Sequence, residues 1–303
     1  MKYEIKSYKE EFLEDQERIG TEETAKWRFA GQATKEQLKE IYSQPDFDPE
    51  TRLYAFLEGK MVGFVTSSIK EEEKVKIGDM RVPFVAEGHE DARGALLEQA
   101  VEVLKDKGAT KIQTPVSPFW GETIQFIEKY KFKHQTDTGY VCQKRLDEID
   151  LKIEPVDVQA FDYQAHADIV AKLVAKQFEA SDEEAKQVVD RYKDWKIGEA
   201  KSPFRFPQKL IFHLLVIENK EVIGRALGFQ SENLGEKVVQ FYAIYAKENN
   251  VKIIGQLLAA GIKESKKLEM EELLLLAGAE EKKLYTSHGL EFTTIVSMYE
   301  KEL

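Results

Sequence analysis

Hydrophobic positions early in each half of the chain alternate in short runs that meet at a polar turn. Residues 52–67 hold two such runs around Glu58-Gly59-Lys60, and residues 213–229 hold two more around Glu218-Asn219-Lys220-Glu221. Apolar runs joined by a short turn of this kind predict a β-hairpin. The second strand of each predicted hairpin contains a glycine, Gly63 or Gly224, at which another part of the chain can pass close to the backbone.

A helical pattern follows each hairpin at nearly the same distance. Apolar residues recur with the spacing of one buried helical face in residues 94–107, and a matching pattern occupies residues 255–267. We expect a strand before each helix, at residues 75–85 and 237–246. A short strand is expected after each helix, at residues 111–114 and 272–276.

A third matched pair closes each half, at residues 126–132 and 284–290. The three pairs share offsets of 218 − 58 = 160, 255 − 94 = 161 and 284 − 126 = 158 residues, which predicts an internal duplication. We expect domains at residues 1–148 and 149–303, with residues 151–154 repeating the opening strand of the first half. Helices are also expected at residues 163–180 and after the capping sequences that begin at Thr34 and Ser181. The predicted fold class is α/β (α+β), with a mixed, largely antiparallel sheet in each half.

Composition removes several classes of function. The 303 residues include 44 Lys and Arg against 55 Asp and Glu, a net charge of −11, which disfavours binding to a phosphate backbone. The acidic surface either maintains solubility or attracts cationic small molecules. No apolar run reaches the ~18 residues of a membrane span, and the first residues lack a signal-peptide core, so we expect a cytoplasmic protein without membrane or nucleic-acid partners. With one cysteine, Cys142, expected to be buried in a strand, and five scattered histidines, no metal site is expected.

The order of elements, the hairpin glycine and the closing Phe-x-Glu-Lys-Tyr-x-Phe segment resemble the GNAT superfamily of acyl-CoA-dependent N-acetyltransferases. The resemblance covers nearly the whole chain twice, as in two-domain members of the mycothiol synthase type. It implies that acetyl-CoA is the co-substrate, and that a small-molecule or peptide amine is the acceptor. Monomeric and homodimeric states both remain open.

In this family, a glycine-rich loop after the fourth strand holds the coenzyme's diphosphate with backbone N–H groups at a helix N-terminus. The first half has Asp91 and Arg93 where the small residues belong, with Glu87 and Glu90 nearby, and we expect it not to bind CoA. The second half has Lys252 and Ile254 at those positions. By resemblance, the cofactor-binding residues are Ile244, Tyr245, Ala246, Asn249, Asn250, Val251, Lys252, Ile253, Ile254 and Gly255. An ordinary helix N-terminus without a ligand is the alternative for this loop.

The closing segment also differs between the two halves. Family members carry a tyrosine at its second position that protonates the departing CoA thiolate, and Tyr285 matches it in the second half. The first half has Ile127 there, which cannot donate a proton, and Lys131 in place of the glycine. Tyr285 is therefore the expected catalytic residue, with a core-filling role as the alternative.

The remaining chemistry implied is direct attack of a neutral amine on the thioester. Backbone N–H groups of residues 244–246 would hold the oxyanion. Candidate general bases are Glu232, Glu236 and Tyr242, each of which could equally be an ordinary loop or strand residue. Aromatic residues at 204–207 would either line the acceptor site or seal a domain interface. The expected function is amine N-acetylation by the second half, and the alternative is a non-catalytic protein that binds a partner or effector.

Overall fold

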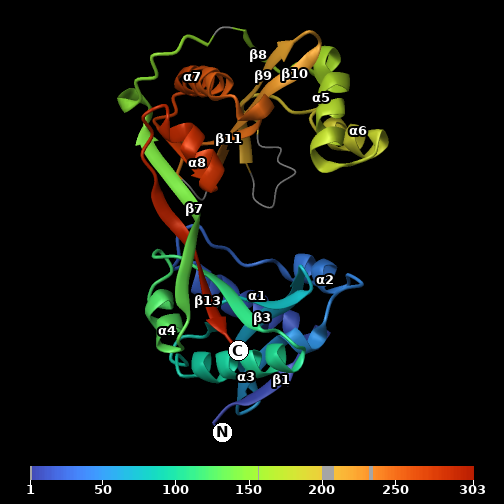
Figure 1. Ribbon diagram of the computed structural model, residues 1–303, viewed down its shortest axis with the longest axis vertical. Helices are drawn as coiled ribbons and strands as arrows, with labels where there is room; N and C mark the ends of the chain where they lie inside the picture. Colours follow the sequence, from blue (N-terminus) through green and yellow to red (C-terminus); the bar gives the residue numbers. More distant parts are fainter. Residues whose placement is uncertain (1, 156, 200–207, 232–234) are drawn as a thin grey trace. The chain divides into compact units, whose positions relative to one another are not determined.

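The structure is a computed structural model that describes residues 2–155, 157–199, 208–231 and 235–303. Its contacts divide the chain into two compact units, which we call unit 1 and unit 2. Unit 1 comprises residues 1–138 and 294–303, and unit 2 comprises residues 139–293. The described strands form one 13-stranded sheet, and in each unit its part is mixed and has helices on both faces, which confirms the predicted fold class (Figure 1).

The elements of unit 1 follow the predicted order. They are β1 (Glu4–Ser7), α1 (Leu13–Thr24), α2 (Lys35–Tyr42), β2 (Arg52–Leu57), β3 (Lys60–Glu72), β4 (Val75–Met80), β5 (Phe84–Val85), α3 (Ala92–Asp106), β6 (Lys111–Val116), α4 (Thr123–Lys129) and the first part of β7 (Lys133–Arg145). The capping box expected at Thr34 is present at the start of α2. The strand expected at residues 75–85 is interrupted at residues 81–83, because Pro83 has no N–H for a ladder hydrogen bond.

Unit 2 repeats this order. Its elements are the second part of β7, β8 (Val158–Ala160), α5 (Tyr163–Phe178), α6 (Asp182–Asp190), β9 (Gln208–Glu218), β10 (Glu221–Ser231), β11 (Val238–Ala246), α7 (Val251–Lys267), β12 (Glu272–Ala277) and α8 (Ala279–Thr286), followed by β13 (Thr293–Glu302). Ser181 caps α6 in the predicted capping box. Residues 151–154 do not form the expected strand, since Pro155 follows them; Ile153 instead packs against Gly255 of α7.

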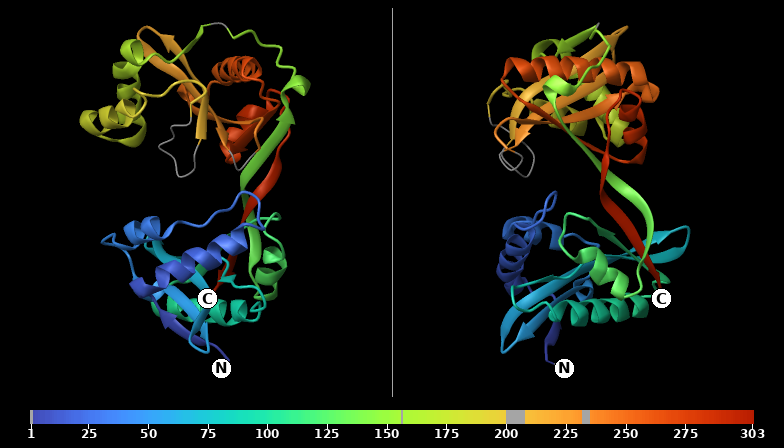
Figure 2. Two further views of the ribbon diagram at one scale, coloured as in Figure 1. Left: turned by 180° about the vertical axis from the view of Figure 1, so that it is seen from behind. Right: turned by 90° about the vertical axis from the view of Figure 1, so that its left-hand side faces the viewer.

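The last strand of each half pairs with the sheet of the other half. β13 pairs antiparallel with β6, from Ser297 opposite Val116 to Glu302 opposite Lys111. The second part of β7 pairs antiparallel with β12, from Tyr140 opposite Ala277 onward. Figure 2 shows β7 and β13 as adjacent strands in both views. The compact units therefore differ from the expected division at residues 148/149, because the two closing strands are exchanged.

The internal duplication extends to the register of the strands. Gly63 lies opposite Ala55 and Val85, and Gly224 lies opposite Val216 and Ala246. A Cβ on Gly63 would lie 2.7 Å from the carbonyl oxygen of Phe84, and one on Gly224 would lie 2.5 Å from Cγ2 of Ile253. Each hairpin glycine thus allows the close approach that was predicted for it.

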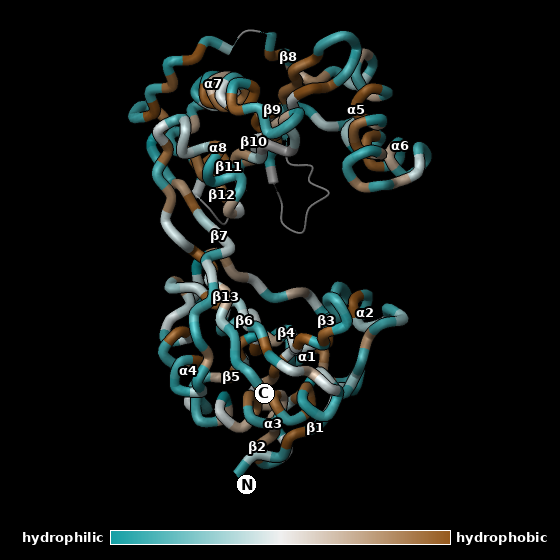
Figure 3. The backbone as a smooth tube through the Cα atoms, in the orientation of Figure 1, coloured by the Kyte–Doolittle hydropathy of each residue, from teal (hydrophilic) through white to brown (hydrophobic). Residues whose placement is uncertain are grey.

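The two larger parts of the core of unit 2 lie on opposite faces of its sheet, and a smaller cluster surrounds Leu210, Leu227 and Phe229. One part packs α7 against β9, β10, β11 and β12, and the other packs α5 and α6 against Leu215 and Val222. Figure 1 shows α7 on one side of these strands and α5 and α6 on the other. Hydrophobic and hydrophilic segments alternate along α5 and α7 in Figure 3, as expected for helices with one buried face. Cys142 is buried in β7, as predicted, and burial raises the pKa of its thiol.

Candidate active site

The parallel strands β11 and β12 separate partway along unit 2. Their pairing runs from Val238 opposite Glu272 to Phe241 opposite Leu275 and ends there. From this point β11 continues beside β10 as far as Ala246, while β12 continues beside β7. The two strands therefore leave an opening in the sheet between residues 242–246 and α8.

β11 carries a β-bulge at this opening. Tyr245 lies opposite Arg225 and Ala243 lies opposite Ala226, so Ile244 is an extra residue without a partner in the β10 ladder. A bulge redirects backbone groups away from the ladder. The backbone of Ile244 therefore has no partner position in the β10 ladder, and the oxyanion-binding role expected for residues 244–246 stays a prediction.

A cavity of about 330 Å³ lies at the opening. Five of the predicted site residues line this cavity: Tyr245, Ala246, Asn249, Ile254 and Tyr285. The lining residues are Gln177, Tyr245, Ala246, Glu248, Asn249, Ile254, Glu281, Leu284 and Tyr285. Three different parts of the sequence therefore converge here: the end of α5, the β11–α7 segment and α8. Gln177, Glu248, Glu281 and Leu284 were not predicted, since a pattern within one helix does not show which face meets a cavity.

Tyr285 lies in the last turn of α8 and reaches this cavity. Its side chain is only 3% exposed, and its ring stacks on Phe292 with centroids 6.0 Å apart. A tyrosine buried to this degree beside a cavity is held in one orientation. The structure thus brings Tyr285 to the same cavity as Tyr245 and Ala246.

The N-terminus of α7 differs from an open anion-binding loop. The side chain of Asn250 accepts hydrogen bonds from the N–H groups of Lys252 (3.0 Å) and Ile253 (3.4 Å). The N–H of Ile254 donates to the carbonyl of Asn250 at 3.1 Å. A diphosphate that binds these N–H groups must therefore displace the Asn250 side chain. The Lys252 side chain is exposed on this first turn.

Other side chains cover the rest of the first turn of α7. Nε2 of His288 lies 2.9 Å from the carbonyl oxygen of Val251, and a Cβ on Gly255 would meet both Ile153 and His288. Gly255 is thus required for packing of the helix against residues 153 and 288. Asn250, Val251, Lys252, Ile253 and Gly255 do not line the cavity described above, although Asn249 and Ile254 do.

The loop before the first turn has an unusual backbone. Glu248 and Asn249 both adopt positive φ angles, of 55° and 52°. Lys247 forms an ion pair with Glu221, with 3.0 Å between Nζ and Oε2. Consecutive left-handed residues turn the chain sharply between β11 and α7 and direct Asn249 toward the cavity.

The equivalent place in unit 1 is occupied by the protein's own side chains. Asp91, at the N-terminus of α3, accepts hydrogen bonds from Tyr3 and from Lys2. Arg93 in the first turn pairs with Glu23, and both side chains are largely buried. A carboxylate at this position repels a diphosphate, and the one nearby guanidinium is already neutralised.

Aromatic rings extend from β5 of unit 1 to the loop that follows β6. Trp27 lies 5.3 Å from Phe84 and stacks on Trp120 with centroids 5.4 Å apart. Nε1 of Trp120 also donates a hydrogen bond to the carbonyl of Arg28. These rings occupy the region of unit 1 that corresponds to the opening beside β11 in unit 2.

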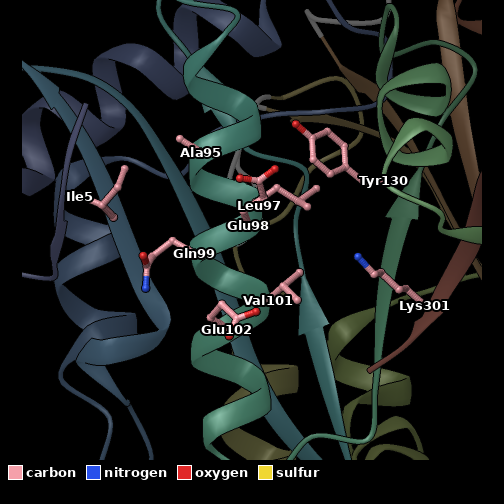
Figure 4. A pocket seen from close by; sticks show the side chains of 9 residues that line it. All are labelled: Ile5, Ala95, Leu97, Glu98, Gln99, Val101, Glu102, Tyr130 and Lys301. Carbon is pink, nitrogen blue, oxygen red and sulfur yellow. The ribbon is translucent and has the colours of Figure 1, made fainter. Parts of the chain in front are cut away.

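Unit 1 has a different hollow along α3. It measures about 490 Å³ and lies beside Tyr130 and Lys301, with Glu98 and Glu102 among its lining residues. Figure 4 shows Glu98 and Glu102 on α3, with Tyr130 and Lys301 on elements beside this helix. The hollow therefore lies along α3 and not at the strand opening.

The structure describes two of the three candidate bases. Glu236 lies two residues before β11 begins at Val238. It is eight residues from Ile244, or about 26 Å along an extended strand, so Glu236 is far from the opening. Tyr242 lies on β11 two residues from the bulge, opposite Leu227. Glu232 and the aromatic residues at 204–207 lie outside the described residues.

A buried polar pair that the sequence did not indicate lies beside the bulge. Nε of Arg225 donates a hydrogen bond to Nε2 of His213 at 3.0 Å, and the two residues are 2% and 4% exposed. Burial, and then the positive charge of Arg225, hold the pKa of His213 well below its usual value of 6.5, so His213 is neutral. Its ring stacks on Phe161 with centroids 4.2 Å apart. Isolated histidine and arginine residues in two strands carry no spacing signal, which is why the sequence did not reveal them.

The described residues contain neither a metal-binding cluster nor a membrane-spanning helix. Among them, no group of three or more His, Cys, Asp or Glu side chains is arranged to hold a metal ion. Within the same residues, every helix is too short or too polar to cross a membrane.

Comparison with known proteins identifies the fold. No family model matches the sequence, and no curated protein matches it either. Among solved structures, a tandem GNAT protein from the clavulanic acid biosynthesis pathway is similar over 99% of this chain and 98% of its own, with a TM-score of 0.58 and 12% identity. A GCN5-related N-acetyltransferase from Sphaerobacter thermophilus is similar over 99% and 96%, with a TM-score of 0.57 and 12% identity. A probable N-acyltransferase from Enterococcus faecalis V583 is similar over 100% and 73%, with a TM-score of 0.56 and 10% identity.

These similarities extend over both halves of the chain. They show that the protein has the tandem GNAT fold, which confirms the fold expected from the resemblance.

Proposed function

We propose that unit 2 transfers an acetyl group from acetyl-CoA to a primary amine. The observation that carries this proposal is the opening between β11 and β12, where Tyr245 and Ala246, which follow the bulge, line one cavity together with the buried Tyr285. The tandem GNAT fold supports an acyl-CoA-dependent acyltransferase, because its solved neighbours include N-acetyltransferases. We also propose that unit 1 has no coenzyme site and serves as a scaffold, because its own side chains occupy the corresponding region.

The cavity suits the acylated arm of the coenzyme better than the whole molecule. Its 330 Å³ lie at the small end of the range for small-molecule sites. The thioester would enter the opening, and the diphosphate would remain outside near Lys252 and the N-terminus of α7. This arrangement requires the Asn250 side chain to move away from the N–H groups that it caps.

The protein's own groups would support direct attack by the amine. Backbone N–H groups at the bulge would stabilise the oxyanion that forms on the thioester carbonyl. Two carboxylates, Glu248 and Glu281, line the cavity and would attract a cationic acceptor. Glu281 already accepts a hydrogen bond from the N–H of Gly278 at 2.9 Å, which leaves Glu248 as the more available base.

Tyr285 would protonate the departing thiolate. A phenol of pKa about 10 gives its proton to a thiolate whose acid has a pKa of about 8.5 at a cost of roughly 2 kcal/mol. Water can also complete this step. We therefore expect Tyr285→Phe to lower kcat by about 10- to 100-fold and to leave the affinity for acetyl-CoA nearly unchanged.

Steady-state acetylation assays test this proposal. CoA release is measured with a panel of polyamines, aminoglycosides, amino acids and peptide N-termini, in the wild type and in Tyr285→Phe. The matched control is Tyr130→Phe, which removes the same hydroxyl near the end of α4 in unit 1 and should leave kcat unchanged. An unaltered kcat in Tyr285→Phe would remove its role as an acid.

A second candidate is a non-catalytic protein that binds a partner or a small effector. The capping of Lys252 and Ile253 by Asn250, together with the cover that Ile153 and His288 provide, favours it. No acetylation of any amine, combined with no binding of acetyl-CoA, would support this second candidate. A cytoplasmic location, and a monomeric or homodimeric state, remain part of the proposal.

A further inference from the structure

The buried guanidinium of Arg225 lacks a negatively charged partner. No ion pair involves Arg225 in the described part of the chain, and its buried Nη2 has no hydrogen-bond partner there. Its one hydrogen bond goes to the neutral imidazole of His213. Burying a charge without a counter-charge is costly, and proteins retain such an arrangement where a ligand supplies the missing charge.

The same place in unit 1 holds an apolar residue. Arg225 lies opposite Leu215 and Tyr245, while Phe64 lies opposite Tyr54 and Phe84. Phe64 is 1% exposed and stacks on Phe84 with centroids 5.0 Å apart. The fold therefore does not require a charge at this position, since one of its two copies fills it with a phenyl ring.

Half-buried aromatic rings cover the guanidinium. Its Cζ lies 5.1 Å from the centre of the Tyr192 ring, and Tyr192 in turn contacts Trp195 at 4.8 Å. Both rings lie in the turns that follow α6 and are only partly exposed. Arg225 is thus one layer of side chains below the surface, at a depth that a small molecule can reach if these rings shift.

The backbone of Arg225 is also close to the bulge at the proposed reaction centre. Arg225 lies directly opposite Tyr245, across a strand spacing of about 4.8 Å, and Tyr245 follows the bulged Ile244. Tyr245 packs with the same α5 and α6 cluster as Leu215, so Arg225 and Tyr245 belong to the same face of the sheet. Arg225 and the bulge are therefore neighbours in the β10–β11 ladder, where an acceptor at the bulge would meet this face of the sheet.

We propose that Arg225 and His213 form a subsite for the carboxylate of the amine acceptor, which makes the acceptor an amino acid or a close analogue. One guanidinium balances one negative charge, which a monoanionic carboxylate supplies with two oxygens in the geometry that a guanidinium prefers. Nη2 would donate to a carboxylate oxygen while Nε keeps its hydrogen bond to His213. The identity of the acceptor class rests on the acyltransferase function proposed above.

The first measurement uses amino acids and their amides as paired acceptors. Glycine, phenylalanine, glutamate and lysine are each compared with the corresponding C-terminal amide at saturating acetyl-CoA. The wild type should prefer at least one acid over its amide by about 10- to 100-fold in kcat/KM, the range expected for a hydrogen bond to a charged group. Arg225→Met should reduce this ratio to about one, and Arg225→Lys should retain part of it.

The matched control is Phe64→Met at the equivalent position of unit 1, which should leave the acid-to-amide ratio unchanged. If Arg225→Met does not fold, the wild-type ratio and Arg225→Lys still decide the question. Equal use of every acid and its amide by the wild type would overturn the subsite. A ratio that Arg225→Met leaves intact would do the same.

A binding measurement separates the subsite from the acyltransferase function. N-acetylglycine, which has no reactive amine, should raise the Tm of the wild type, whereas N-acetylglycinamide and Arg225→Met should show no such shift. A shift for N-acetylglycine without any acetylation would support the subsite and contradict the acyltransferase. Acetylation with no shift and no acid preference would support the acyltransferase and contradict the subsite.

Discussion

At the scale of single residues, His213 is the side chain whose charge depends most on burial. Burial and Arg225 hold its pKa well below 6.5 in the folded protein, while the unfolded chain releases it to water. Above pH 6.5 the imidazole is neutral in both states. Below pH 6.5 the unfolded chain takes up a proton that the native protein does not, so folding loses stability as the pH falls.

We therefore expect His213→Gln to reduce the acid sensitivity of unit 2. In the wild type this one group lowers the free energy of unfolding by up to about 1.4 kcal/mol per pH unit between pH 6.5 and about 5. Calorimetric Tm values at pH 5.0 to 7.5 measure the effect. The control His134→Gln, at a more exposed site in β7, should follow the wild type. Parallel Tm curves for His213→Gln and wild type would contradict a neutral buried histidine.

The sequence pattern predicted some of the residues at the site and missed others. Tyr285, Tyr245 and Ala246 could be proposed because a closing segment and a strand end recur in both halves, and the structure brings them to one cavity. The sequence could not show that the side chain of Asn250 caps the N–H groups expected to hold a diphosphate. Arg225 and His213 were also hidden, because pairing of β9 with β10 brings them together from either side of a turn.

At the scale of elements, local periodicity predicted most helices and strands of both halves but not the partners of the closing strands. β7 and β13 occupy equivalent places in the duplication. The sequence pattern of either strand therefore does not indicate which half of the chain the strand pairs with. The exchange is fixed by contacts distant in sequence, including Ser297 and Thr294, whose hydroxyls donate to Asp137 at 2.7 and 3.0 Å.

Removal of residues 293–303 should consequently destabilise unit 1, although these residues follow unit 2 in the chain. β6 would lose the partner that it has from Ser297 to Glu302. Hydrogen exchange should show loss of protection in residues 111–116, with residues 272–277 retaining most of theirs, since β12 pairs with β7 and β11. The substitution Asp137→Asn in the intact chain is a milder control and should produce a smaller change in the same segment. Loss of protection concentrated in β12 would contradict the strand exchange.

At the scale of the whole molecule, the two units share a fold but differ in what fills the strand opening. In unit 1, Asp91 is held by Tyr3 and Lys2, and stacked tryptophans occupy the region beside β5 and β6. In unit 2, the corresponding region is a cavity with Tyr285 in its wall. This difference is the reason why we propose one coenzyme site per chain instead of two.

Calorimetric titration of acetyl-CoA into the full chain shows whether unit 2 alone binds the coenzyme. We expect saturable binding with one molecule per chain, accompanied by hydrogen-exchange protection in residues 242–256 and none in residues 84–96. Absence of heat and of any thermal shift at millimolar acetyl-CoA would contradict a coenzyme site in unit 2, and binding of two molecules per chain would contradict the assignment of unit 1.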